Sequence, residues 1–221
     1  MAATEPVPRV LKVLVIHGYR QSAKSSREKT GSFRKGLKKY LDLVYFTAPN
    51  KLPAVSVTDE NSREEYGWWF SKRQNSLSFN AHEQSEIDPG HEASVELIKK
   101  TFIEQGPFDG LLGFSQGATM AAHICALREQ EETPFQFKFA ILCAGFKSRS
   151  TAHQKYYNRP ITCPVLHVYG DTDQVIPKEM SLELEELFTD STVLNHPGGH
   201  YLPATATERK VYQQFLDRFR T

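Results

Sequence analysis

The sequence has few cysteines and no long apolar run. Its 3 cysteines stand far apart, and none of them forms the C-x-x-C spacing of a redox or zinc motif. This argues against a disulfide framework and a structural zinc site, and it favours a reducing compartment. No apolar run approaches the length that crosses a bilayer, and residues 1–9 contain no apolar signal core. We therefore expect a cytoplasmic protein, with the nucleus as a second location, and no integral membrane association.

The chain also lacks an excess of charge of one sign. It has 27 lysines and arginines and 26 aspartates and glutamates, which gives a net charge of +1 at pH 7. Nothing in this balance indicates a nucleic-acid partner or an anionic membrane surface. The acidic stretch 82–92 contains two histidines but no H-E-x-x-H spacing, so we interpret it as a solvated loop and predict no metal site.

The most informative segment is a G-x-S-x-G motif between an apolar strand and a helix rich in small residues. A chain that passes from strand to helix within a few residues needs a sharp turn, and Gly113 and Gly117 leave room for it. Such a turn exposes the hydroxyl of Ser115 beside the N-terminus of a helix, where N–H groups favour developing negative charge. We therefore predict that Ser115 is a nucleophile.

Apolar runs typical of buried strands alternate with helical segments along the chain. Besides the strand before Gly113, we expect strands at 10–16, 43–46, 139–143, 165–169 and 192–194. Helices are expected at about 26–41, 88–105 and 116–128, after Pro177 and at the C-terminus. This order predicts an α/β fold: a mostly parallel six-stranded sheet with helices on both faces, in three layers. No linker or repeat divides residues 1–221, so we expect one domain.

Regular periodicity fails between about residues 49 and 89. A stretch of this length without a clear element is typical of a lid or a binding loop. It contains Trp68, Trp69 and Phe70, which could either pin the loop to the core or form an apolar wall over the serine. Both interpretations are open. With Phe146, these three residues are our candidates for binding an apolar acyl group.

A serine becomes a good nucleophile when a histidine accepts its proton and a carboxylate holds that histidine. In folds of this kind the order along the chain is serine, acid, histidine. Asp171 and Asp173 compete for the acid, and we favour Asp173 because Asp171 is placed to bond the turn backbone. We favour His200 as the base because it follows two glycines, whereas His196 ends a strand.

The first strand ends in the sequence H-G-Y-R at residues 17–20. A turn of this kind can direct a backbone N–H toward the reacting carbonyl. We predict that Tyr19 supplies one N–H of an oxyanion hole. Gln116, the residue after the serine, would supply the other.

Several segments together resemble the family of serine hydrolases (FSH) within the α/β-hydrolases. They are H-G-Y-R-Q-S (17 to 22), R-E-K-T-G (27 to 31), G-W-W-F (67 to 70), G-P-F-D-G-L-L-G-F-S-Q-G-A (106 to 118), G-D-T-D-Q-V-I-P (170 to 177) and G-G-H (198 to 200). The similarity extends from about residue 9 to residue 220 and includes the spacing of the motifs. It implies an α/β-hydrolase fold, a nucleophile at Ser115, an acid at Asp173 and a base at His200. It also implies hydrolysis of carboxylic esters or thioesters without a metal or an organic cofactor.

We therefore expect a serine carboxylesterase that cleaves small acyl esters through an acyl-enzyme, with an apolar medium-to-long acyl chain. An acyl thioesterase with the same residues is one alternative. A catalytically inactive ligand-binding protein on this fold is the other. The sequence carries no signal for the oligomeric state.

Overall fold

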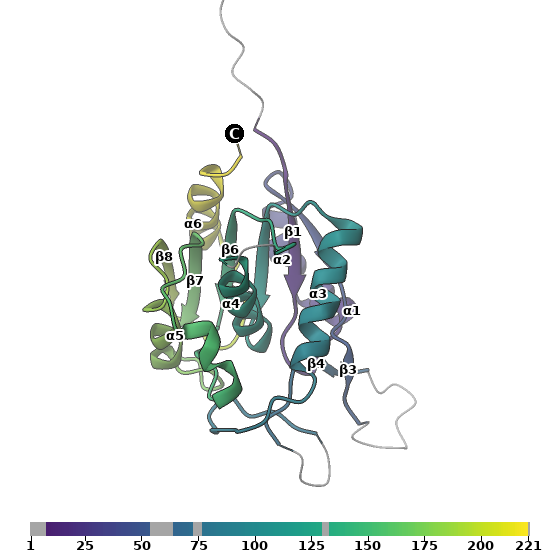
Figure 1. Cartoon of the computed structure of the whole chain (residues 1–221). Helices are drawn as coiled ribbons and strands as arrows, with labels where there is room; N and C mark the ends of the chain where they lie inside the picture. The colour runs from purple at the N-terminus through teal and green to yellow at the C-terminus, as the bar shows by residue number, and fades with distance from the viewer. Residues whose placement is uncertain (1–7, 54–63, 73–76, 130–132, 221) are drawn as a thin grey trace, which may run out of the picture.

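A six-stranded sheet forms the centre of the computed structural model, which describes residues 8–53, 64–72, 77–129 and 133–220. The strand order is β2-β1-β5-β6-β7-β8, and every neighbouring pair is parallel (Figure 1). The strands are β1 (Leu11–Ile16), β2 (Leu41–Tyr45), β5 (Gly110–Phe114), β6 (Phe139–Cys143), β7 (Val165–Gly170) and β8 (Ser191–His196). The predicted six-stranded parallel sheet is confirmed.

Helices cover both faces of this sheet, which confirms the three layers (Figure 1). One face carries α3 (His91–Gln105), α4 (Gln116–Arg128) and α5 (Lys178–Glu185), and the other carries α1 (Ala23–Lys29), α2 (Gly31–Gly36) and α6 (Ala206–Asp217). A 3₁₀ helix, η1 (Thr151–Tyr157), follows β6. In the part of the chain that the structure describes, no helix has the length and apolar character needed to span a membrane.

Side chains along β1 alternate between two buried cores. Leu14 and Ile16 belong to the core beneath α3, α4 and α5, whereas Leu11, Val13 and Val15 belong to the core with α2 and α6. A strand that is covered on both faces must be apolar at nearly every position. This is why the run at 10–16 lacks the polar alternation of a half-exposed strand.

One predicted helix is divided in two. The expected helix at 26–41 ends as α1 at Lys29, and α2 then begins at Gly31. Between them Thr30 has a ψ of 15°, and its hydroxyl donates to the Ser26 carbonyl at 2.8 Å. A threonine whose hydroxyl bonds the preceding turn weakens a helix, and so does a glycine. The series of helical hydrogen bonds is therefore interrupted at Thr30 and Gly31.

The segment from 49 to 89 contains a short antiparallel pair in its described part, β3 (Asn50–Lys51) with β4 (Tyr66–Gly67). Residues 54–63 and 73–76 of this segment lie outside the described residues. The helix expected from residue 88 begins later, at His91, because Gly90 has a φ of +87° and cannot continue a right-handed helix. That the segment is a lid-like insertion in a single domain stays a prediction.

Candidate active site

Ser115 lies in the sharp turn between β5 and α4. Its φ is +53° and its ψ is −122°, a strained conformation for any residue with a side chain. Its N–H donates to the Cys143 carbonyl of β6 at 2.8 Å, which ties the turn to the sheet. A Cβ on Gly117 would lie 2.1 Å from the Ile16 carbonyl oxygen, and one on Gly113 would lie 2.4 Å from the α4 backbone. Both glycines are therefore needed for the close approach of strand and helix.

Asp173 and His200 are in direct contact. His200 Nδ1 lies 2.7 Å from Asp173 Oδ2, while Asp173 Oδ1 accepts the N–H groups of Val175 and Ile176, each at 2.8 Å. Burial alone would raise the pKa of Asp173, but the hydrogen bonds from His200 and the two N–H groups outweigh it and hold this pKa below its usual value. The carboxylate therefore stays ionised and can fix the orientation of the His200 ring.

The two competing residues lie elsewhere. Asp171 is exposed, and its Oδ1 lies 3.0 Å from Lys178 Nζ and 3.0 Å from Asn195 Nδ2. His196 is buried at the end of β8, where its Nδ1 accepts the Gly198 N–H at 3.2 Å. The contact between acid and histidine is thus made by Asp173 and His200.

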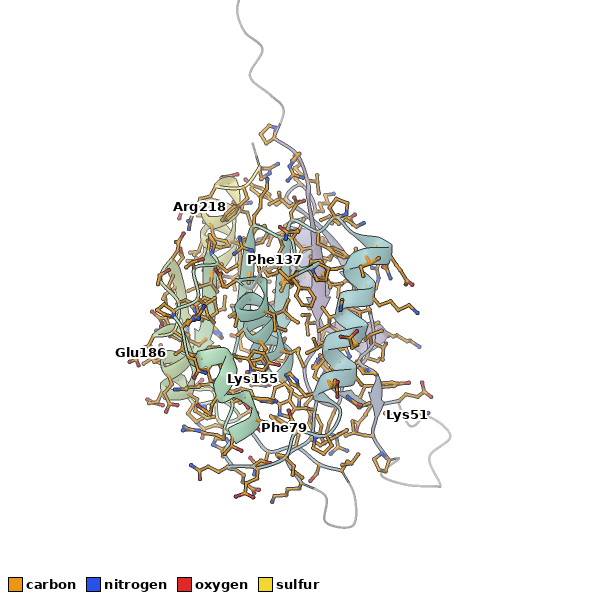
Figure 2. All side chains as sticks on the ribbon, viewed as in Figure 1. Lys51, Phe79, Phe137, Lys155, Glu186 and Arg218 are labelled. Atoms are coloured by element: carbon orange, nitrogen blue, oxygen red, sulfur yellow. The ribbon has the colours of Figure 1, made fainter. Side chains whose placement is uncertain are left out.

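A cavity of about 980 Å³ exposes Ser115 and His200 together, beyond the carboxyl ends of the strands. The ring of Phe114 packs against the His200 ring with a centroid distance of 4.8 Å. Figure 2 shows Phe79, another residue of the cavity wall, at the end of the molecule toward which the β1 arrow points in Figure 1. The serine, the histidine and the cavity therefore lie together at the carboxyl ends of the strands.

Two backbone N–H groups border the Ser115 turn. Tyr19 lines the cavity, and Gln116 is the first residue of α4. Within the described ranges no protein group accepts a hydrogen bond from the N–H of either residue. His17 braces this turn: its Nε2 accepts the Ala48 N–H at 3.0 Å, so its Nδ1–H donates to the Gly18 carbonyl at 2.8 Å. Burial lowers the pKa of His17 to about 4, which keeps the ring neutral in this role.

Similarity to known proteins agrees with this geometry. The sequence model of the family described as serine hydrolase (FSH1) matches residues 7–212. The chain belongs to this family. Esterase OVCA2 of Xenopus tropicalis is 49% identical over an alignment of 231 residues, gaps included, which covers 100% of both chains.

Among solved structures, Arabidopsis thaliana SOBER1 has a TM-score of 0.60 at 15% identity, with 96% of this chain and 99% of that chain covered. Zea mays acyl-protein thioesterase 2 has a TM-score of 0.56 at 16% identity, with 97% of each chain covered. The two structures share the α/β-hydrolase fold with this serine hydrolase.

In this serine hydrolase, the four aromatic residues expected at the acyl pocket lie in the core. Trp68, Trp69, Phe70 and Phe146 are at most 1% exposed, and none of them lines the cavity. The Trp68 indole N–H donates to the His17 carbonyl at 2.6 Å, so this ring braces the turn from beneath. Of the two interpretations of the aromatic cluster, the one that describes these side chains is a loop pinned to the core.

Other residues form the apolar wall of the cavity. They come from five separate segments and are Tyr19, Phe79, Phe114, Val175, Ile176 and Leu202. Tyr19 packs on Phe79 with a ring distance of 5.3 Å, which joins the first loop to the irregular segment. No periodic pattern marks Phe79 or Leu202 in the sequence, because both lie outside helices and strands.

Proposed function

We propose that this serine hydrolase is a carboxylesterase that uses Ser115 as nucleophile, His200 as base and Asp173 as acid. The observation that carries the proposal is the 2.7 Å contact of Asp173 with His200 at the cavity that also exposes Ser115. As the Ser115 oxygen attacks the ester carbonyl, its proton passes to Nε2 of His200. The Asp173 carboxylate stabilises the imidazolium that forms.

The N–H groups of Tyr19 and Gln116 would bind the oxyanion of the tetrahedral intermediate. Neither donates to another described group, so both are available, and the second lies at the N-terminus of α4. Collapse of the intermediate breaks the ester bond, and the leaving alkoxide takes the proton from His200. Water then attacks the acyl-enzyme, gives a proton to His200, and releases the carboxylic acid with regeneration of Ser115.

The substrate that fits best is a small acyl ester with an apolar medium-to-long chain. The cavity volume of about 980 Å³ and its wall of aromatic and aliphatic side chains support an extended acyl group. The name of the Xenopus relative, an esterase, supports oxygen esters as substrates. A thioester would be cleaved by the same steps, so the two leaving groups have to be compared directly.

The decisive experiment is labelling with a fluorophosphonate probe, with wild type beside Ser115→Ala and Ser191→Ala. Wild type and the exposed-serine control Ser191→Ala should label, whereas Ser115→Ala should not and should lose about four to six orders of magnitude in kcat. A chain-length series of p-nitrophenyl esters and matched thioesters then ranks the substrates. A folded wild-type protein that neither labels nor hydrolyses any of them would favour the ligand-binding alternative.

A further inference from the structure

Three histidines from separate elements are buried together outside the cavity. They are His91 of α3, His123 of α4 and His153 of η1, and they are 4%, 0% and 0% exposed. One ring nitrogen of each lies within 4.8 Å of those of the other two. We propose that this cluster, the three-histidine site, binds one divalent transition-metal ion of the zinc type as a structural site.

The spacing of two of the inward nitrogens suits such an ion. His91 Nε2 and His123 Nδ1 are 3.0 Å apart. Two imidazole nitrogens bound tetrahedrally to zinc at about 2.0–2.1 Å stand roughly 3.3 Å from each other. The first two ligands would therefore have to move by only a few tenths of an ångström to share a metal ion.

His153 supplies the third nitrogen. Its Nδ1 lies 2.7 Å from Ser148 Oγ, which leaves the lone pair of Nε2 to bind a metal ion. This Nε2 is buried and makes no hydrogen bond within the described residues. Asp88 Oδ2 lies 3.2 Å away, at ion-pair distance but without hydrogen-bond geometry. A buried nitrogen without a partner is costly, and coordination of a metal ion would give His153 Nε2 the partner that it lacks.

Two of the three outer nitrogens already have the partners that metal-bound histidines need. His123 Nε2 lies 2.8 Å from the Tyr157 hydroxyl, and His153 Nδ1 lies 2.7 Å from Ser148 Oγ. Metal-ligating histidines donate their second ring N–H to such oxygens, which fixes the tautomer and turns the other lone pair toward the ion. With Nε2–H of His123 and Nδ1–H of His153 donating outward, the inward nitrogens of these two residues carry lone pairs. The lone pair of His123 Nδ1 then accepts the Nε2–H of His91, a hydrogen bond that the metal ion would replace.

The three-histidine site would join segments that the sheet alone does not hold. His123 lies on the helix that begins after Ser115, and His153 packs edge-on against Trp69 at a ring distance of 5.2 Å. A bound ion would therefore fasten η1 and the start of α3 to α4, with the Trp69 ring packed against the site. Lys155 marks η1 in the lower half of the molecule in Figure 2. The sequence predicts no metal because these histidines come from three distant elements and share no short-range spacing.

The test uses the full chain after removal of metals with a chelator. We expect titration calorimetry with Zn²⁺ to give one ion per chain, Zn²⁺ to raise Tm, and Co²⁺ to give the visible absorption of a tetrahedral complex. His153→Gln should abolish these signals. His167→Gln, which changes an equally buried histidine outside the cluster, and His200→Gln, in the cavity, should retain them.

A milder variant guards against loss of the fold. Tyr157→Phe keeps all three histidines but removes the oxygen that orients His123, and it should weaken Zn²⁺ binding by about 10- to 100-fold. The proposal is overturned if the wild-type chain binds no stoichiometric ion, or if Tyr157→Phe binds Zn²⁺ as tightly as wild type. It is also overturned if His200→Gln loses the ion while His153→Gln keeps it. None of these results depends on hydrolytic activity.

Discussion

The side-chain amide of Gln116 holds the backbone of Trp68. Its Oε1 accepts the Trp68 N–H at 2.9 Å, and its Nε2 donates to the carbonyl of the next residue, Trp69, at 2.8 Å. All three residues are buried, so water does not compete for these bonds. The residue that follows Ser115 in the sequence thus anchors the backbone of Trp68 and Trp69 to the strand–helix turn.

Replacing Gln116 with leucine should therefore destabilise the protein. The Trp68 N–H and the Trp69 carbonyl would be buried without partners, at a cost of about 1–3 kcal/mol each in the free energy of unfolding. Denaturant melts of Gln116→Leu measure this cost. Gln136→Leu, at an exposed position, is the control and should change stability by less than about 0.5 kcal/mol. Equal stability of the two variants would contradict the anchoring role.

The same bonds explain what the sequence could predict and what it could not. The turn at Ser115 is local, because strand, glycines and helix follow one another, and it was predicted correctly. The backbone of Trp68 and Trp69 is held by Gln116, 48 and 47 positions away, which no local pattern reveals. The cavity wall was missed at Phe79 for a similar reason, since its position depends on packing against Tyr19 rather than on periodicity.

The acid can be identified by comparing two aspartates of the same loop. Asp173→Asn should lower kcat by about 10⁴, because an amide can donate to His200 Nδ1 and so favour the tautomer that cannot accept the serine proton. Asp171→Asn removes only an exposed ion pair with Lys178 and should leave kcat near the wild-type value. Initial rates on one p-nitrophenyl ester decide the matter. Similar losses in both variants would argue against Asp173 as the acid.

The close approach at the strand–helix turn can be tested with two glycines. Gly117→Ala places a Cβ 2.1 Å from the Ile16 carbonyl oxygen and 2.3 Å from that of His17, and these backbone atoms cannot turn away as a flexible side chain could. We expect a large loss of Tm, together with loss of fluorophosphonate labelling. In Gly31→Ala the new Cβ meets nothing within 4 Å, and alanine is the better helix residue by about 0.5–1 kcal/mol. This control should be neutral or stabilised, and a Gly117→Ala protein that melts like it would contradict the packing argument.

The charge of the cavity wall predicts a substrate preference. Lys29 lines the cavity, whereas no aspartate or glutamate is among the described residues that line it. An ester that carries a carboxylate at the far end of its acyl chain should gain from this lysine relative to the methyl-ended ester of equal length. Lys29→Glu should lower the ratio of the two kcat/KM values about fivefold, as expected for an exposed charge pair of about 1 kcal/mol. Lys35→Glu makes the same charge change outside the cavity, and an equal effect there would assign the preference to the overall charge.

Two isolated histidines should make the folded state sensitive to acid. Burial lowers the pKa of His17 to about 4 and that of His167 to about 3, from 6.5 in the unfolded chain. Well above pH 6.5 both histidines are neutral in the folded and in the unfolded state, so they do not make the free energy of unfolding depend on pH there. As the pH falls below that value the unfolded chain binds the protons first, and the free energy of unfolding drops by up to about 1.4 kcal/mol per pH unit for each histidine.

His167→Leu separates one of these contributions. His167 Nε2 is buried without a hydrogen-bond partner among the described residues, and its ring packs edge-on against Phe188 at 5.1 Å, so an aliphatic side chain leaves no acceptor unpaired. Denaturant melts at about pH 7.5 and about pH 5 should show a drop in stability that is smaller than in wild type by about 2 kcal/mol. Leucine at position 167 cannot take up a proton in the unfolded state, so the free energy of unfolding of the variant must change less with pH. An identical change with pH in the two proteins would mean that His167 is not the group whose protonation favours unfolding.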